Sequence, residues 1–213
     1  MTWHPEALAL RQQRVLAQVG PFLTQRGFYL AGGTAVALHL GHRRSVDLDW
    51  FMAGGIPDPL HLAQDLREQG VAFVTGQVAP GTLHGSVRGV RLGLLEYRYP
   101  LLAPLRPWRG GIRIVARADL AAMKLAAVAQ RGAKKDFVDV YALGSRSGSL
   151  RQMLRWYQEK YTVSDLAHVL YGLAYFDDAD RERMPRMLWD VTWRTMKETI
   201  RRWLRDVTRS WGN

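Results

Sequence analysis

The sequence predicts an α+β fold in which a mixed sheet is followed by a helical C-terminal region. Short apolar segments separated by glycine turns recur between residues 28 and 116, and such segments are typical of strands. From about Gly144 to the end, the pattern of apolar residues is helical. An order of helix, then helix and strand mixed, then helix alone favours an α+β domain with a helical C-terminal part.

The first elements are a helix, a short strand and a buried helix. Residues 5–26 have helical spacing, with an expected interruption near Gly20 and Pro21 because proline cannot donate the backbone hydrogen bond of a helix. Residues 28–31 predict a short strand. The apolar stretch 34–41 predicts a short buried helix that ends at its final glycine.

Most of the predicted sheet follows. Residues 45–52 (SVDLDWFM) alternate with a period of two and predict a strand, and residues 57–69 predict an amphipathic helix. Four further strands are expected at 71–78, 83–89, 90–99 and 111–116.

The remaining chain predicts helices. Asp119 is a candidate N-cap for a helix to Gln130, and a second helix begins near Lys134. The segment GSRSGS at 144–149 is the best candidate for a linker. We expect a core at residues 1–117 with N-terminal helices, and a helical region at 118–213 that completes the active site.

Composition limits the classes of protein. The 213 residues carry a formal net charge of +11, which favours polyanionic partners such as nucleic acid or nucleotides, although a basic solvated surface is equally compatible with it. The chain has no cysteine, so disulfides and thiolate metal sites are excluded. No apolar run reaches the length of about 18 residues that a membrane span needs. These features predict a protein of the cytoplasm that has no membrane partner.

Two aspartates stand in the predicted strand 45–52. Residues i and i+2 of a strand point to the same face, so Asp47 and Asp49 should lie side by side, with Val46, Leu48 and Trp50 directed into the core. Two close carboxylates repel each other unless a positive group lies between them. A hard divalent cation, best Mg²⁺, would satisfy them.

The simpler alternative is a surface salt-bridge cluster in which Arg43, Arg44 or another arginine pairs with the two aspartates. The preceding turn favours the metal site. Gly32, Gly33 and Thr34 lie between a strand and the start of a helix, where exposed N–H groups form a ready anion site. A phosphate cradle beside paired carboxylates describes a site for a nucleoside triphosphate with Mg²⁺.

Two blocks carry a family resemblance. "GGTAVALHLGHRRSVDLDWF" (32–51) and "DLAAMKLAAVAQRGAKKDFVDVYAL" (119–143) resemble the signature segments of the AbiEii/AbiGii-type nucleotidyltransferases. The segment 175–200 is similar to a tail found in short members of that group. The resemblance implies a polymerase-β-like nucleotidyltransferase core, an RNA acceptor such as the 3′ end of tRNA, and a toxin role with an antitoxin protein as partner.

The resemblance also implies roles for residues. Gly32, Gly33 and Thr34 would hold the triphosphate, Asp47 and Asp49 would hold Mg²⁺, Lys124 would contact the phosphates, and Asp136 would be a catalytic or positioning carboxylate. We also expect the nucleotide to contact three further residues, Arg44, Ser45 and Arg131. The spacing agrees in part, because Lys124 and Arg131 fall on one helix face, as do Asp136 and Asp139.

A third carboxylate is harder to place. Enzymes of this fold bring one from a neighbouring strand, but the strand 90–99 has Gly93 where an acid would be expected and has Glu96 as its one acid. Glu96 is therefore the candidate third metal ligand, with a surface role as the alternative.

Two functions compete with transfer to RNA. The chain could bind a nucleotide or RNA without catalysis, or transfer a nucleotide to a protein hydroxyl. The best candidate for guiding RNA is a basic cluster without neighbouring acids beside Trp108, formed by Arg106, Arg109 and Arg113.

Overall fold

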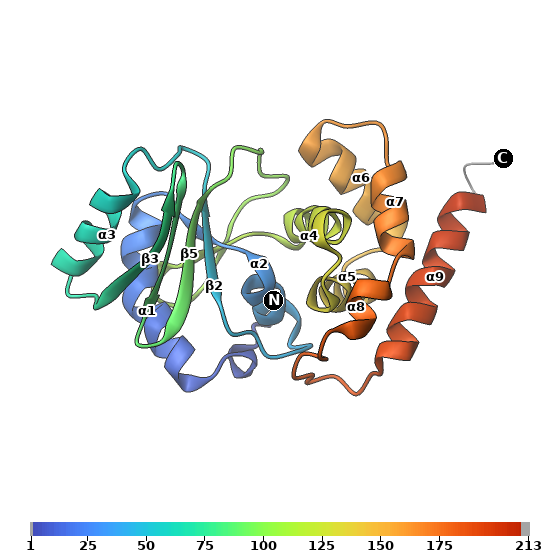
Figure 1. Ribbon diagram of the computed structural model, residues 1–213, viewed down its shortest axis with the longest axis horizontal. Coiled ribbons are helices and arrows are strands. Elements are labelled where there is room, and N and C mark those ends of the chain that lie inside the picture. Colours follow the sequence, from blue (N-terminus) through green and yellow to red (C-terminus); the bar gives the residue numbers. More distant parts are fainter. Residues whose placement is uncertain (1, 210–213) are drawn as a thin grey trace.

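A mixed sheet forms the centre of the first half of the molecule. The computed structural model describes residues 2–209 (Figure 1). The strands are Tyr29–Leu30 (β1), Leu48–Met52 (β2), Phe73–Ala79 (β3), Thr82–Val87 (β4), Val90–Glu96 (β5), Arg106–Pro107 (β6) and Arg113–Ile114 (β7). Their order is β3-β4-β5-β2-β1-β7-β6. β2 runs parallel to β5 and β1 parallel to β7, whereas the other neighbours are antiparallel, so the expected mixed sheet is confirmed.

Helices cover both faces of this sheet. A 3-10 turn at Pro5–Ala7 precedes the first three helices, which are Leu10–Gln25 (α1), Gly32–Leu40 (α2) and Pro59–Glu68 (α3). α1 and α3 cover one face, and α2 lies against the other (Figure 1). α2 is buried along almost its whole length and ends at Gly41 in the left-handed conformation, as the sequence predicts.

The expected interruption of the first helix is wrong, because α1 continues through Pro21. Gly20 lies directly against Ile112 and close to Trp50, where any larger side chain would overlap them. The helix also buries Val15 and Leu23 completely. This packing outweighs the loss of one backbone hydrogen bond at the proline.

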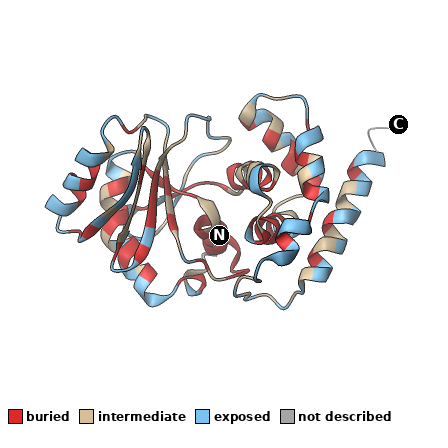
Figure 2. Ribbon diagram, viewed as in Figure 1, coloured by how far each residue is buried: buried red, intermediate tan, exposed pale blue. Residues whose placement is uncertain are grey.

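The second half is helical, as expected. Its helices are Arg117–Arg131 (α4), Lys134–Arg146 (α5), Leu150–Tyr161 (α6), Ala167–Ala174 (α7), Asp177–Arg181 (α8) and Trp193–Arg209 (α9). α4 and α5 lie next to α2, while α9 packs at the far side with an exposed outer face (Figure 2). The division at residue 117 stays a prediction. Across residues 2–209, no helix has the length and apolar character to cross a membrane.

Two local expectations need correction. Asp119 is not the N-cap of α4, because the cap position is Ala116 and the Asp119 side chain is buried inside the first turn. It accepts a hydrogen bond from the N–H of Leu102 and pairs with Lys160. The linker is also shorter than expected, since α5 continues to Arg146 and Ser149 caps α6.

Candidate active site

Both aspartates of the β2 region line a cleft of about 610 Å³. One side of the cleft is formed by the start of α2, the chain leading into β2, and β2 itself. The other side is formed by α4, the first turn of α5, α6 and α7. Asp49 lies in β2, whereas Asp47 precedes the strand. The cleft therefore brings together segments that are up to 136 residues apart in sequence, from Gly32 to His168.

Asp49 is a largely buried carboxylate with an unusual environment. Its side chain makes no hydrogen bond or ion pair to another residue in the described part of the chain. Burial, and then the nearby Asp47 carboxylate, raise the pKa of Asp49. Gly32 has a φ of +63°, and a Cβ there would lie 2.6 Å from Asp49 Oδ2. Gly93 faces the other carboxylate oxygen, with a Cβ position 3.0 Å from Oδ1. The two glycines thus leave room for the carboxylate at the cleft.

Asp47 is held in place by its neighbours. Its carboxylate accepts hydrogen bonds from Arg91 Nε at 2.7 Å and from Arg91 Nη2 at 3.2 Å. The Thr34 hydroxyl donates to the backbone carbonyl of Asp47 and lies 2.8 Å from Ser45 Oγ. Because Asp47 lies outside the strand, Val46 does not point into the core as expected and is 63% exposed.

Glu96 does not join the two aspartates, so its assignment as a third metal ligand is wrong. The register pairs Asp49 with Gly93, so Glu96, three residues beyond Gly93, points to the opposite face of β5. Its carboxylate pairs with Arg98 beside a different hollow. In the part of the chain that the structure describes, no three His, Asp or Glu side chains are grouped as a metal site. Among the described residues, the cleft therefore offers a metal two carboxylates, those of Asp47 and Asp49.

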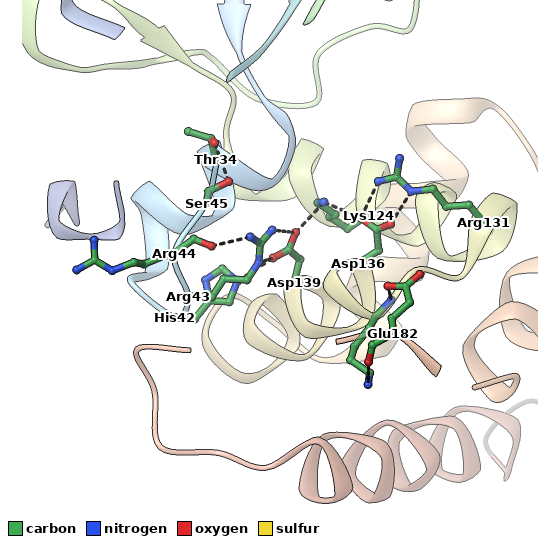
Figure 3. Close-up of polar contacts among 11 residues, drawn as sticks. Thr34, His42, Arg43, Arg44, Ser45, Lys124, Arg131, Asp136, Asp139 and Glu182 are labelled. Atoms are coloured by element: carbon green, nitrogen blue, oxygen red, sulfur yellow. Dashed lines mark hydrogen bonds and ion pairs between the residues drawn. The ribbon is translucent and has the colours of Figure 1, made fainter. Parts of the chain in front are cut away.

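A cationic group lines the same cleft and is formed by Arg43, Lys124 and Arg131. Figure 3 shows its ion pairs with two buried aspartates. Lys124 of α4 places its ammonium 2.8 Å from Asp136 Oδ1 and 2.7 Å from Asp139 Oδ2. Burial alone would lower the pKa of Lys124, but the carboxylates of Asp139 and Asp136 outweigh it and raise the pKa. Lys124 is consequently charged, and the third N–H of its ammonium remains for a ligand in the cleft.

Asp136 lies behind this cationic group and not at the cleft surface. It is fully buried and accepts hydrogen bonds from Lys124, at 2.8 Å, and from Arg131, with Arg131 Nε 2.7 Å from Oδ2. Burial would raise the pKa of Asp136, but Lys124 and Arg131 lower it. Asp136 therefore orients the two cations, both of which line the cleft.

Asp139 organises the other side of the group. Its buried carboxylate accepts from Arg43 Nε at 2.7 Å and from Nη2 at 2.8 Å, and His42 Nε2 lies 2.8 Å from Oδ1. Burial would raise the pKa of Asp139, but Arg43, Lys124 and His42 hold it well below its usual range. Burial lowers the pKa of His42, which is consequently neutral. α5 and the chain after α2 are thereby fixed to each other.

The remaining expected nucleotide contacts divide into two groups. Gly32, Gly33 and Ser45 line the cleft, and the first N–H groups of α2 have no acceptor within the helix. Thr34 and Arg44 do not line it. The Thr34 hydroxyl is occupied by the chain leading into β2, and the Arg44 side chain points away from the cationic group (Figure 3).

Sequence reasoning missed several residues of the cleft. Lys135 is exposed at its wall and has no ion pair with any residue the structure describes, and Arg43 lines it from the other side. Lys135 stands in the signature segment 119–143, which was a usable signal. The wall formed by Tyr97 and Tyr99 had no signal in the sequence. Arg106, Arg109 and Arg113 do not line the cleft.

Comparisons with known proteins identify the family. Residues 95–210 match the family described as nucleotidyl transferase AbiEii toxin, type IV toxin–antitoxin system. An uncharacterized protein of Aquifex aeolicus (strain VF5) is 35% identical over 178 residues, which cover 82% of this chain and 86% of that protein. The chain belongs to the AbiEii family. The AbiEii chain is thus a nucleotidyltransferase, as its signature segments led us to expect.

A solved structure supports the fold. MenT4, a nucleotidyltransferase toxin from Mycobacterium tuberculosis, aligns over 91% of the AbiEii chain and 82% of its own, with a TM-score of 0.54 and 17% identity. The Megavirus polyadenylate synthase aligns over 63% of the chain and 31% of its own length, with a TM-score of 0.45 and 17% identity. The MenT4 match confirms the α+β fold of a nucleotidyltransferase.

Proposed function

We propose that this chain transfers a nucleoside monophosphate from a nucleoside triphosphate to an RNA hydroxyl, with the 3′ end of tRNA as the expected acceptor, and that it acts as a toxin restrained by an antitoxin protein. The observation that supports this proposal is the pairing, across one cleft, of two carboxylates with a group of cations. Carboxylates that hold a metal and cations that hold phosphates are the two parts that phosphoryl transfer requires.

The donor set fits Mg²⁺. Asp49 has a raised pKa and no side-chain partner among the described residues, so a cation would stabilise its ionised form. Mg²⁺ usually binds through one or two carboxylates, with water and substrate phosphates as its other ligands. Asp47 and Asp49 supply those carboxylates. When bound, the ion would neutralise negative charge on the phosphate oxygens during transfer.

The residues of the chain would position the substrates. Lys124, Arg131 and Lys135 would contact the triphosphate, with Asp136 as a positioning residue behind the first two. The N-terminus of α2 adds backbone donors at Gly33. In the reaction the acceptor oxygen bonds to the α-phosphorus, the bond to the leaving pyrophosphate breaks, and the hydroxyl proton passes to solvent. Holding the two reactants in line supplies much of the rate.

Incubation with each labelled triphosphate, Mg²⁺ and total tRNA tests this function. Label on RNA is the expected result. Label on the protein would instead support transfer to a protein hydroxyl, and no label under any condition would leave a nucleotide-binding protein without catalysis.

Asp49→Asn provides the decisive variant. The change keeps the size of the side chain and removes the charge that a cation needs, so transfer should fall to background. The folded protein should be at least as stable as the wild type, because a carboxyl with a raised pKa is costly to ionise in the folded state. Full transfer by a folded Asp49→Asn protein would refute the metal assignment.

The RNA acceptor has a separate test. The net charge of +11 supports a polyanionic partner, and Arg106, Arg109 and Arg113 are exposed. Replacing all three with alanine should weaken RNA binding and reduce the slope of log affinity against log salt by about 2 to 3, since each phosphate contact contributes about 0.7 to 0.9. Triphosphate binding should not change.

A matched triple alanine variant on α9 serves as the comparison. Its changes are at Arg201, Arg202 and Arg205. A reduced slope for the α9 variant alone would move the RNA surface to that helix, and equal slopes for all proteins would exclude both surfaces.

A further inference from the structure

An aromatic wall forms part of the lining of the cleft. Phe51, Tyr97, Tyr99, Tyr157 and Tyr161 all line the cleft. Their ring centroids follow one another at 5.2 Å from Phe51 to Tyr97, 5.2 Å from Tyr97 to Tyr99, 4.6 Å from Tyr99 to Tyr161 and 4.7 Å from Tyr161 to Tyr157. The rings come from β2, from the chain after β5 and from α6, so tertiary packing alone assembles the wall.

A buried ion pair holds this wall in place. Lys160 is fully buried, and its ammonium lies 2.7 Å from Asp119 Oδ1 and 2.7 Å from the carbonyl oxygen of Pro100. Asp119 also accepts from the N–H of Leu102 at 2.9 Å. The Lys160 ammonium lies 5.3 Å from the ring centre of Tyr97. The segment that carries the aromatic rings is therefore anchored to α4 and α6.

The hydroxyl groups of the wall are mostly occupied. Tyr97 and Tyr161 share a hydrogen bond of 2.6 Å, and the Tyr157 hydroxyl lies 2.9 Å from His168 Nε2. Burial raises the pKa of Tyr161 to about 12 and raises that of Tyr97 as well, so both remain neutral. Tyr99 differs from these residues. It is 46% exposed, and its hydroxyl makes no hydrogen bond to the residues that the structure describes.

We propose that this aromatic wall is a stacking site for an unpaired nucleobase, with Tyr99 as its principal contact. Aromatic rings offer π-faces and apolar edges, and nucleobases bind such surfaces by stacking. Tyr99 is the ring of this wall that is exposed, which makes it the accessible face. The cleft also lies within the range of about 300 to 1,000 Å³ that small-molecule sites occupy. The proposal rests on the proposed function and adds where the base lies.

The base has two possible sources, the nucleoside triphosphate or the terminal nucleotide of the RNA acceptor. For the triphosphate as the source, calorimetry measures the affinity for ATP, GTP, CTP and UTP. Inorganic tripolyphosphate is the matched control ligand, because it has no base. For the RNA acceptor as the source, the affinity for an RNA hairpin with an unpaired 3′ end is compared with the affinity for the same hairpin with a blunt end. Removing a base–aromatic stack reduces affinity by about 5- to 150-fold.

The variants are Tyr99→Ala, Tyr99→Trp and, as the control, Tyr171→Ala. Tyr171 is 73% exposed on α7 and does not line the cleft. We expect Tyr99→Ala to weaken binding of at least one triphosphate by the factor given above and to leave tripolyphosphate binding unchanged. Tyr99→Trp should restore the affinity, because tryptophan also stacks, and Tyr171→Ala should behave as the wild type.

The outcomes separate the two sources and the two proposals. If triphosphate affinity is unchanged and the preference for the unpaired RNA end is lost, the base belongs to the acceptor. If Tyr99→Ala changes neither, the stacking site is refuted while nucleotide transfer stands. If the wild type binds neither triphosphate nor tripolyphosphate with Mg²⁺ present, the proposed function fails and this inference fails with it.

Discussion

Asp139→Asn tests how much the buried ion pairs behind the cationic group stabilise the fold. The Asp139 carboxylate is fully buried and receives Arg43 through two nitrogens, at 2.7 and 2.8 Å, and Lys124 at 2.7 Å. The amide keeps the shape but leaves two buried cations with Asp136 as the remaining carboxylate. Removing one partner of a buried ion pair typically costs about 3 to 5 kcal/mol. In a chain of 213 residues this corresponds to a fall in Tm of about 6 to 20 °C.

Circular dichroism during heating, together with urea unfolding, measures this loss. Asp190→Asn is the matched control, because Asp190 is exposed and such changes usually stay within about 0.5 kcal/mol. The pKa of Asp139 is lowered in the folded state, so its contribution is complete above the unfolded pKa of about 3.9. The difference between wild type and variant should therefore be constant at neutral pH and shrink only below about pH 4. A loss below about 1 kcal/mol at pH 7 would refute this account of the buried network.

Two further changes test the two sides of the cleft. Arg91→Gln should raise the affinity for Mn²⁺ by up to about fivefold, because the exposed Arg91–Asp47 ion pair competes with the metal and such pairs are worth about 0.2 to 1 kcal/mol. Electron paramagnetic resonance measures this affinity, and an unchanged value would mean that the pair does not restrain Asp47. Lys124→Ala should weaken triphosphate binding by about 1.5 to 3 kcal/mol, the usual worth of a hydrogen bond to a charged group, and should also lower Tm, because Asp136 and Asp139 lose a shared cation. Calorimetry that shows normal triphosphate affinity for a folded Lys124→Ala protein would limit Lys124 to a structural role.

The buried ion pairs explain why two aspartates that look alike in the sequence, Asp49 and Asp139, have different roles in the structure. Asp49 and Asp139 are both largely withdrawn from solvent, but the pKa of Asp49 is raised and that of Asp139 is lowered. The difference arises from their neighbours. Asp139 is bonded to Arg43, His42 and Lys124, whereas Asp49 faces the cleft next to another carboxylate. Asp139, with its bonded cations, therefore stabilises the fold, whereas the Asp49 carboxylate is free to meet a ligand.

Local patterns predicted most of the elements. The buried helix α2 followed from a mostly apolar stretch between glycines, and β2 followed from alternation around Leu48 and Trp50. The predictions failed where a distant contact decided the outcome. α1 continues through Pro21 because Gly20 packs on Ile112, and Val46 is exposed because the strand begins two residues later. Asp119 does not cap α4 as expected, because its side chain pairs with Lys160, which is 41 residues away in the sequence.

The sequence by itself determined the two carboxylates at Asp47 and Asp49, the glycine turn before α2, and the spacing that places Lys124 and Arg131 on one helix face. These features depend on residues close together in the chain, where the period of a helix or strand fixes which side chains share a face. The tertiary structure decided the rest. The register of β5 against β2 turned Glu96 away from Asp49, and packing of α6 against the chain after β5 formed the aromatic wall. Strand register and helix packing are set by contacts between distant residues, so the local pattern cannot contain them.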